Sequence, residues 1–150
     1  MNKIGLVAAL AAFGLSCSVA AAQEFGTAAE ARTMIDRGIT ELKTNEGAAL
    51  AKFNDKDNKQ FRDRDLYVFC FNLSDGIFTA HPNPAVKGTD IRNLKVADDT
   101  LGQRLFAAAK DGSVATVNYN FPKPGTTNPV PKESYVTRVG GQGCAVGYYK

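Results

Sequence analysis

Hydrophobic residues near the start of the folded region recur with the spacing of a helix. Thr27 and Glu30 have the spacing of a capping box, in which the two side chains accept hydrogen bonds from backbone N–H groups of the first turn. Apolar residues then return every three or four positions along one face: Ala31, Met34, Ile35, Ile39 and Leu42. The pattern predicts a long helix over 27–45, followed by a shorter amphipathic segment over 47–54.

Most of the remaining chain has the alternating pattern and the turn residues that are typical of strands. Asp75-Gly76 is a strong hairpin signal, because both residues tolerate the positive φ of a tight turn. A helix is expected over 98–112 and a proline-rich loop over 122–131. The predicted strands are 66–72, 77–81, 113–121, 133–139 and 144–149. Strands that follow one another closely pair antiparallel, so we expect an α+β domain with a five-stranded antiparallel sheet.

The first 22 residues have the pattern of a secretory signal peptide. One lysine precedes an unbroken run of apolar and small residues, with Ala20 and Ala22 before the expected cut. We therefore expect a signal peptide over 1–22 and a single domain over 23–150.

Cys17, at the end of the apolar run, raises the alternative of a lipoprotein. A lipidated cysteine normally follows a leucine and then a small residue, whereas those positions hold Gly14 and Leu15 here. No later apolar run approaches the ~20 residues that a membrane-spanning helix needs. The expected product is an exported, soluble protein of the periplasm or the extracellular space.

Charge argues against a nucleic-acid partner. The chain has a formal net charge of +3, and the 17 basic and 15 acidic residues that remain without Lys3 give +2. The densest charge cluster, over 52–65, alternates in sign, whereas a phosphate-binding surface is one-sided. We interpret this cluster as a solvated connector with weak ion pairs.

His81 is the only histidine of the chain and follows the second predicted strand. A zinc site would require further ligands at suitable spacing, and no second histidine or paired-cysteine motif is present. No nucleophile motif such as G-x-S-x-G accompanies it. We therefore expect no metal, no cofactor and no catalytic residue, and interpret His81 as a hydrogen-bonding residue of the core or of a pocket.

Three aromatic residues of the first predicted strand, Tyr67, Phe69 and Phe71, share one face because strand side chains alternate. The simplest expectation is that they pack against the apolar stripe of the long helix. The hydroxyl groups of Tyr67 and Tyr119 make these two residues better candidates for a pocket than the phenylalanines.

Lys132 and Tyr135 follow the proline-rich loop in the segment PKESYV. A pocket for a small anion needs a cation and one or two hydroxyl groups that orient it. A lysine at the mouth of a strand meets this need, and the alternative is an exposed lysine on a loop.

Several segments together resemble the Cache family, the extracytoplasmic ligand-sensing domains of bacterial chemoreceptors and sensor kinases. They are AALAKFND, LYVFCFNLSDGIFTAHPN, KGTDIRNLKVADDTLGQ, GSVATVNYNFPKPG and PKESYVTRV, and the resemblance covers roughly 28–150. It implies the small single-module form: a long N-terminal helix on a PAS/profilin-like sheet with strand order 2-1-5-4-3. It also places His81, Lys132 and Tyr135 near the ligand pocket.

The strand order that the resemblance implies sets Cys70 beside Cys144, the two cysteines outside the signal segment. We expect a disulfide between them in an oxidising compartment, with two buried thiols as the alternative.

The sequence ends at Lys150, without the transmembrane helix that receptors of the family carry after the last strand, so we expect a free-standing form. The expected function is binding of a short-chain carboxylate of two to four carbons at Tyr67, His81, Tyr119, Lys132 and Tyr135. A membrane receptor or kinase is the expected signalling partner. The alternatives are an interaction module without a ligand and, least favoured, an enzyme.

Overall fold

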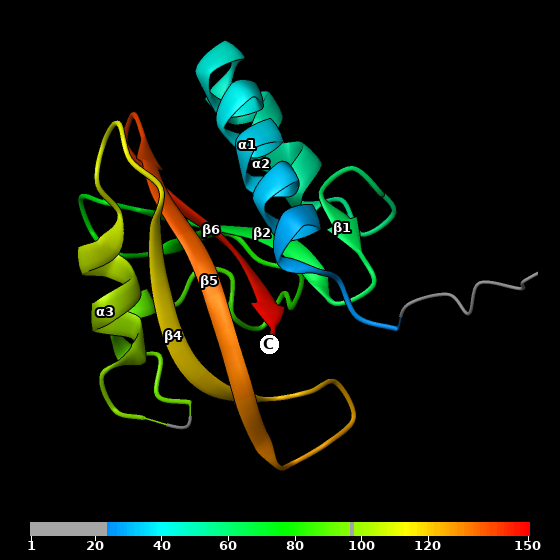
Figure 1. Ribbon diagram of the computed structural model, residues 1–150. Helices are drawn as coiled ribbons and strands as arrows, with labels where there is room; N and C mark the ends of the chain where they lie inside the picture. The colour runs from blue at the N-terminus through cyan, green and yellow to red at the C-terminus, as the bar shows by residue number, and fades with distance from the viewer. Residues whose placement is uncertain (1–23, 97) are drawn as a thin grey trace, which may run out of the picture.

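A computed structural model describes residues 24–96 and 98–150 (Figure 1). The expected signal peptide and Cys17 lie outside the described residues. The elements, in chain order, are α1 (Ala28–Thr44), α2 (Glu46–Asn54), β1 (Arg62–Asp63), β2 (Leu66–Asn72), β3 (Phe78–Ala80), the 3₁₀ turn η1 (Ile91–Asn93), α3 (Leu101–Ala108), β4 (Ala115–Pro122), β5 (Pro129–Val139) and β6 (Gln142–Tyr149). The α+β class is confirmed.

Helix α1 begins at the predicted capping box. The Glu30 N–H donates to Thr27 Oγ1 at 3.2 Å, and the Thr27 N–H donates to the Glu30 carboxylate at 2.7 Å. The buried face contains Ala31, Met34, Ile35, Gly38 and Leu42. Ile39 of the predicted stripe is only partly buried, and Gly38 lies on the buried face, where a Cβ would meet Phe53 and Val68.

The predicted strand order is confirmed. Strand β2 pairs with β3 on one side and β6 on the other, and β5 and β4 complete the order β3-β2-β6-β5-β4, with every pair antiparallel. The two-residue strand β1, which the sequence pattern did not predict, also pairs with β2. Figure 1 shows β4 and β5 as long, curved neighbouring strands.

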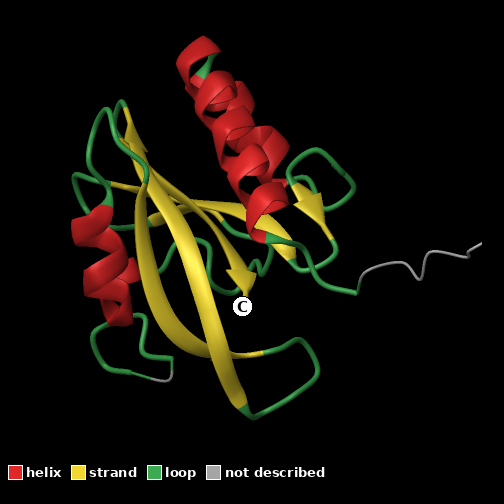
Figure 2. Cartoon of the chain, viewed as in Figure 1, coloured by secondary structure: helices red, strands yellow, loops and turns green. Residues whose placement is uncertain are grey.

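Both faces of the sheet are covered (Figure 2). Helices α1 and α2 pack on one face around Val68, Cys70 and Val146, while α3 and the connection that precedes it, with η1, cover the other. The expectation that Tyr67, Phe69 and Phe71 pack against the long helix is wrong. All three belong to the α3 face, since the alternate residues of β2 occupy the α1 face.

The predicted disulfide joins Cys70 and Cys144. The two residues are direct cross-strand partners in β2 and β6, with their Cα atoms 4.1 Å apart. Both are fully buried on the α1 face. The bond therefore fixes the register of the two central strands beneath the helix pair.

The largest differences from the predicted element bounds are in α3 and β5. Helix α3 is shorter than expected and ends at Ala108, where the Ala109 N–H donates to the Phe106 carbonyl. Strand β5 begins at Pro129, inside the expected proline-rich loop. The part of β5 before Lys132 pairs with β4 alone, so the missing proline N–H groups remove no bond to β6.

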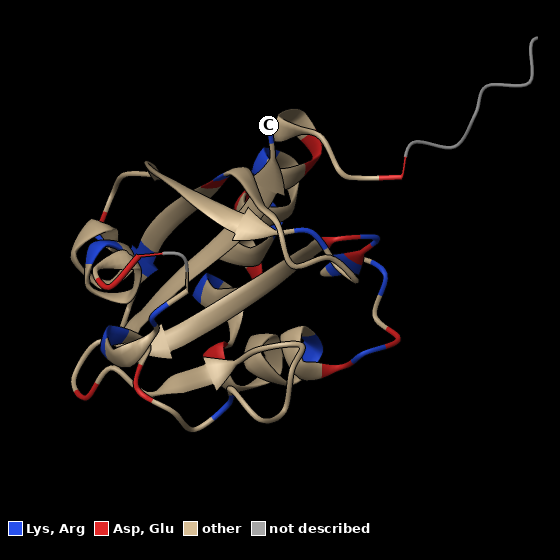
Figure 3. Cartoon of the chain, turned by 90° about the horizontal axis from the view of Figure 1, so that it is seen from below, with Lys and Arg blue, Asp and Glu red and all other residues tan. Residues whose placement is uncertain are grey.

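The charged connector over 52–65 is only partly solvated. Phe61 within it is 1% exposed, and Asp65 is 8% exposed. Basic and acidic residues are interspersed around the molecule rather than gathered by sign (Figure 3). None of the helices in the described ranges is long and apolar enough to cross a membrane.

Candidate functional site

A cavity of about 530 Å³ lies on the α3 face of the sheet. Strands β2, β4 and β5 supply one side of its lining, and the connection from β3 to α3 supplies the other. Four of the five residues predicted to bind a ligand line it: Tyr67, His81, Tyr119 and Lys132. Tyr119 and Lys132 are direct cross-strand partners, so their side chains lie next to each other on the same face of the sheet.

Lys132 lies within β5 and is only 4% exposed, so it is neither at the mouth of a strand nor exposed on a loop. Its ammonium lies 4.3, 5.0 and 5.7 Å from the ring centroids of Tyr149, Phe121 and Tyr67. Burial lowers the pKa of Lys132 to about 8, with the charge of Asp65 acting in the opposite direction. Cation–π contacts thus partly replace the solvation that this cation has lost.

The negative charge of Asp65 acts on the Lys132 ammonium from a distance. No carboxylate of the described residues lies within 4 Å of this ammonium. Asp65 Oδ1 accepts the Gly26 N–H at 2.6 Å. Its Oδ2 is buried without a hydrogen-bond partner among the described residues. The Lys132 ammonium therefore keeps its donors available to a ligand.

Tyr119 presents a neutral hydroxyl beside this cation. Its OH forms a 2.8 Å hydrogen bond with Ser134 Oγ, and burial raises the pKa of Tyr119. Gly147 of β6 makes room for the group, since a Cβ there would stand 2.8 Å from Ser134 Oγ and 3.0 Å from the Tyr119 hydroxyl. Burial likewise raises the pKa of Tyr67, so both phenols stay protonated near neutral pH.

His81 closes one side of the cavity. Its ring packs against Tyr67, Phe69 and Phe78 with centroid separations of 5.6, 6.2 and 5.4 Å. Nδ1 accepts the Asn83 N–H at 3.0 Å, which leaves the proton of the neutral ring on Nε2. Burial lowers the pKa of His81, and the nearby charge of Lys132 adds to this lowering. His81 is therefore a neutral hydrogen-bond donor at pH 7.

Comparison with known proteins identifies the fold. A family model described as Single Cache domain 2 matches residues 19–148. The chain belongs to this family.

Solved structures of chemotaxis proteins and sensor domains resemble this single Cache domain. A methyl-accepting chemotaxis protein from Vibrio parahaemolyticus superposes with a TM-score of 0.63 at 22% identity, covering 81% of this chain and 86% of that one. The periplasmic sensor domain of a chemotaxis protein gives 0.57 at 26% identity, covering 79% and 87%. A Cache chemosensory domain solved for its carboxylic acid recognition gives 0.51 at 24% identity, covering 79% and 85%.

One curated relative is a whole receptor. The methyl-accepting chemotaxis protein McpP of Pseudomonas putida is 29% identical over 75 residues, which cover 49% of this chain and 14% of the receptor. The single Cache domain thus corresponds to a small part of that protein.

Tyr135 is the one predicted ligand-binding residue that the single Cache domain places away from the cavity. It belongs to the α1 face, where its ring stacks on Tyr148 with centroids 5.7 Å apart and lies 5.8 Å from the Arg32 guanidinium carbon. Lys132 and Tyr135 are three positions apart on one strand, so they face opposite sides of the sheet. We therefore leave Tyr135 out of the candidate site.

Sequence reasoning missed several parts of the site. Arg62 lines the cavity from the unpredicted strand β1, and Tyr149 supplies the ring nearest to the Lys132 ammonium. Gly147 carried a usable signal, because a glycine inside a strand often marks a close approach of another group.

The described residues contain no group of three or more His, Cys, Asp or Glu side chains placed to hold a metal ion.

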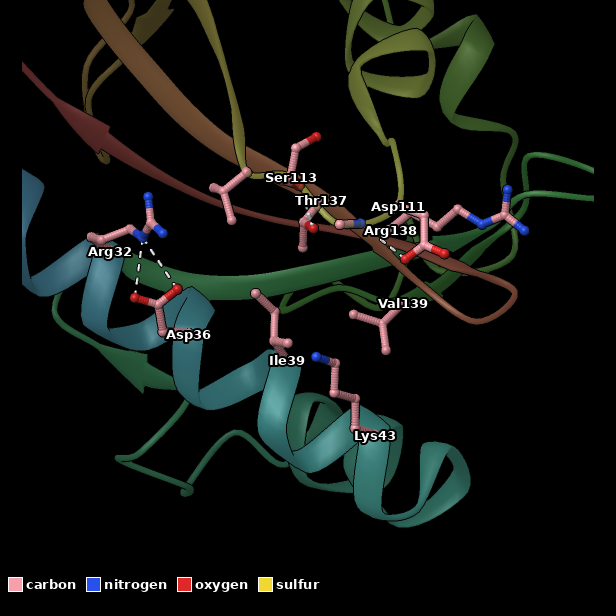
Figure 4. Close-up of a pocket in the computed structure, with 11 residues that line it drawn as sticks. Arg32, Asp36, Ile39, Lys43, Asp111, Ser113, Thr137, Arg138 and Val139 are labelled. Carbon is pink, nitrogen blue, oxygen red and sulfur yellow. Dashed lines mark hydrogen bonds and ion pairs between the residues drawn. The ribbon is translucent and has the colours of Figure 1, made fainter.

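A second hollow, of about 290 Å³, lies between α1 and β5 (Figure 4). Its charges are largely matched, because Arg32 Nε lies 3.1 Å from the Asp36 carboxylate, and Lys43, Arg138 and Asp111 also line it. The Arg32 and Asp36 side chains are 49% and 52% exposed, so water screens this pair. Nothing in this hollow resembles the desolvated cation of the α3-side cavity.

Proposed function

We propose that this domain is an exported sensory module that binds a small organic carboxylate, with Lys132 as the charge partner. The observation that carries the proposal is a buried lysine, Lys132, which is 4% exposed and lines a cavity of about 530 Å³ without a carboxylate of the described residues within 4 Å of its ammonium. A buried charge is stable when it is paired, and a ligand carboxylate supplies the pair.

The neighbouring groups suit a carboxylate. The neutral hydroxyls of Tyr67 and Tyr119 and the Nε2–H of His81 can donate to its oxygens, and the surrounding rings exclude water. A short acid of two to four carbons, as the sequence leads us to expect, needs only this polar part of the cavity. The solved Cache domain with carboxylic acid recognition supports the same ligand class.

The cavity also bears on the competing interpretations. An interaction module without a ligand would have a core-filled sheet face, whereas this face has a cavity with a buried cation. An enzyme would need an activated nucleophile or an acid–base pair, and we propose none here. The similarity to chemotaxis receptors and to a periplasmic sensor domain supports a role outside the cytoplasm with a membrane receptor or kinase as partner.

Calorimetric titration with propionate tests the role of Lys132. Replacing Lys132 with Met keeps the apolar stem but removes the charge, and a hydrogen bond to a charged group contributes about 1.5–3 kcal/mol. We expect Lys132→Met to weaken binding by about 10- to 150-fold.

Lys43→Met is the matched control, because Lys43 lines the hollow on the other face. It should leave propionate affinity unchanged. Equal affinities of wild type and Lys132→Met would remove Lys132 from the site. A protein that binds no small carboxylate, by heat or by thermal shift, would refute the proposed function.

A further inference from the structure

The two sides of the α3-side cavity differ in chemistry. The sheet side carries the ammonium of Lys132 and the hydroxyls of Tyr67 and Tyr119. The opposite wall, from the connection between β3 and α3 and from α3 itself, includes His81 and Asn83 and is otherwise apolar in its described lining residues: Pro82, Val86, Leu94, Val96, Leu101 and Leu105. Phe69 and Phe78 extend this apolar surface onto β2 and β3.

The cavity volume exceeds the need of a short acid. At about 30 Å³ per water molecule in the liquid, 530 Å³ corresponds to roughly 18 non-hydrogen atoms. An acid of two to four carbons has about four to six such atoms. With its carboxylate at Lys132, a short acid would leave most of the aliphatic wall in contact with water.

We propose that the preferred ligand is a monocarboxylic acid with an extended apolar body, a medium-chain fatty acid of about eight carbons or an arylalkanoic acid of similar size. This inference rests on the proposed function and deepens it. The carboxylate binds Lys132, and the body lies between Phe69 and Phe78 on one side and the aliphatic wall on the other. Each buried methylene contributes about 0.8 kcal/mol, so the wall favours longer acids over shorter ones.

A chain-length series tests the inference by calorimetric titration of the purified chain with acetate, butyrate, hexanoate and octanoate. We expect the affinity to rise about fourfold per methylene up to about eight carbons. 1-Octanol, which has the same body without the charge, should bind at least about tenfold more weakly than octanoate.

A substitution in the wall sharpens the test. Val86 is half-buried in the wall, and Val86→Phe fills part of the apolar space. This variant should weaken octanoate binding about tenfold or more and leave acetate binding unchanged. Val139→Phe is the matched control, because Val139 is equally half-buried in the hollow on the α1 face. If Val86→Phe does not fold, Leu94→Phe in the same wall replaces it.

The outcomes separate the two proposals. A flat or falling series from acetate to octanoate, or Val86→Phe and Val139→Phe behaving alike, overturns the preference for a long acid and leaves carboxylate binding in place. Octanol binding as tightly as octanoate also overturns the inference, since the charge would then contribute nothing. Absence of binding by every acid overturns the proposed function itself.

Discussion

Two hollows on opposite faces of this domain differ in how their charges are neutralised. On the α1 face, Arg32 and Asp36 form an ion pair in which both side chains are about half exposed. On the α3 face, Lys132 is 4% exposed and its ammonium lies near aromatic rings, with no carboxylate of residues 24–96 and 98–150 within 4 Å. The number of charges around a hollow therefore does not identify a binding site. The informative feature is a buried charge that has no ion-pair partner and lies next to an open cavity.

The largest expected effect tests whether ligand binding on the α3 face is independent of the disulfide on the α1 face. The disulfide closes a segment with a sequence separation of 74 residues, and Cys70→Ala with Cys144→Ala should lower the free energy of unfolding by about 4 kcal/mol in the chain-entropy model. Because both cysteines face α1, propionate affinity should not change at temperatures where the variant is folded. Denaturant unfolding and titration measure the two quantities, and a parallel loss of binding would show that the faces are coupled.

The second largest effect is expected at Gly147, whose lack of a side chain leaves room for Lys132 and Ser134. A methyl group at Gly147 would stand 3.0 Å from Lys132 Cε and 2.8 Å from Ser134 Oγ. Gly147→Ala should therefore displace the anchoring groups, with an overpacking penalty of about 1–3 kcal/mol and about tenfold weaker propionate binding. Gly141→Ala is the control, because a Cβ there meets nothing within 4 Å and φ is not positive. Equal behaviour of the two variants in titration and unfolding would contradict this account.

The pH dependence distinguishes the buried cation from a surface lysine. Burial lowers the pKa of Lys132 to about 8, so propionate affinity should fall as pH rises through this value and then decrease about tenfold per unit. The unfolded chain, with a lysine pKa of about 10.4, binds more protons between about pH 8 and 10.4. The contribution of Lys132 to the stability of the unliganded fold therefore rises with pH in that window, opposite to affinity.

Lys132→Arg is the control for the pH profile, because its guanidinium stays charged across the range. Where this variant binds propionate, its affinity should be flat between about pH 7 and 10. A wild-type profile that is equally flat would show that the charge of Lys132 does not control binding.

The smallest effect is expected on the α1 face. Arg32→Gln removes the i,i+4 pair with Asp36, and exposed pairs of this kind contribute about 0.3–0.5 kcal/mol. The variant also loses the cation–π contact with Tyr135, so the free energy of unfolding should fall by no more than about 1.5 kcal/mol. Propionate affinity should not change. A binding defect in Arg32→Gln would show that the α1-side hollow, and not the α3-side cavity, recognises the ligand.

Local signals predicted much of the fold. The Thr27–Glu30 capping box, the Asp75-Gly76 turn and the helical period of α1 each depend on residues close in sequence, and each is present in the structure. The strand order came from the family resemblance rather than from periodicity, and it placed Cys70 beside Cys144 correctly.

The sequence could not show which face of the sheet Tyr67, Phe69 and Phe71 occupy, because helices cover both faces and both are apolar. The separation of Lys132 from Tyr135 was available, since a spacing of three residues reverses the face of a strand. The prolines of β5 masked its start, because a strand that lacks one neighbour can accept residues without an N–H.

Strand β6 has a consequence for how ligand preference can change. All eight of its residues are buried, and it pairs with β2 on one side and β5 on the other. The sheet beneath the cavity is thus organised before a ligand arrives, and little conformational entropy is lost there on binding. The wall from Val86 to Val96 contains only the short turn η1 as regular structure. Substitutions in this wall can therefore change which apolar ligand body is preferred, while Lys132 on the sheet still binds the carboxylate. Affinity for the carboxylate and selectivity for the rest of the ligand can change independently.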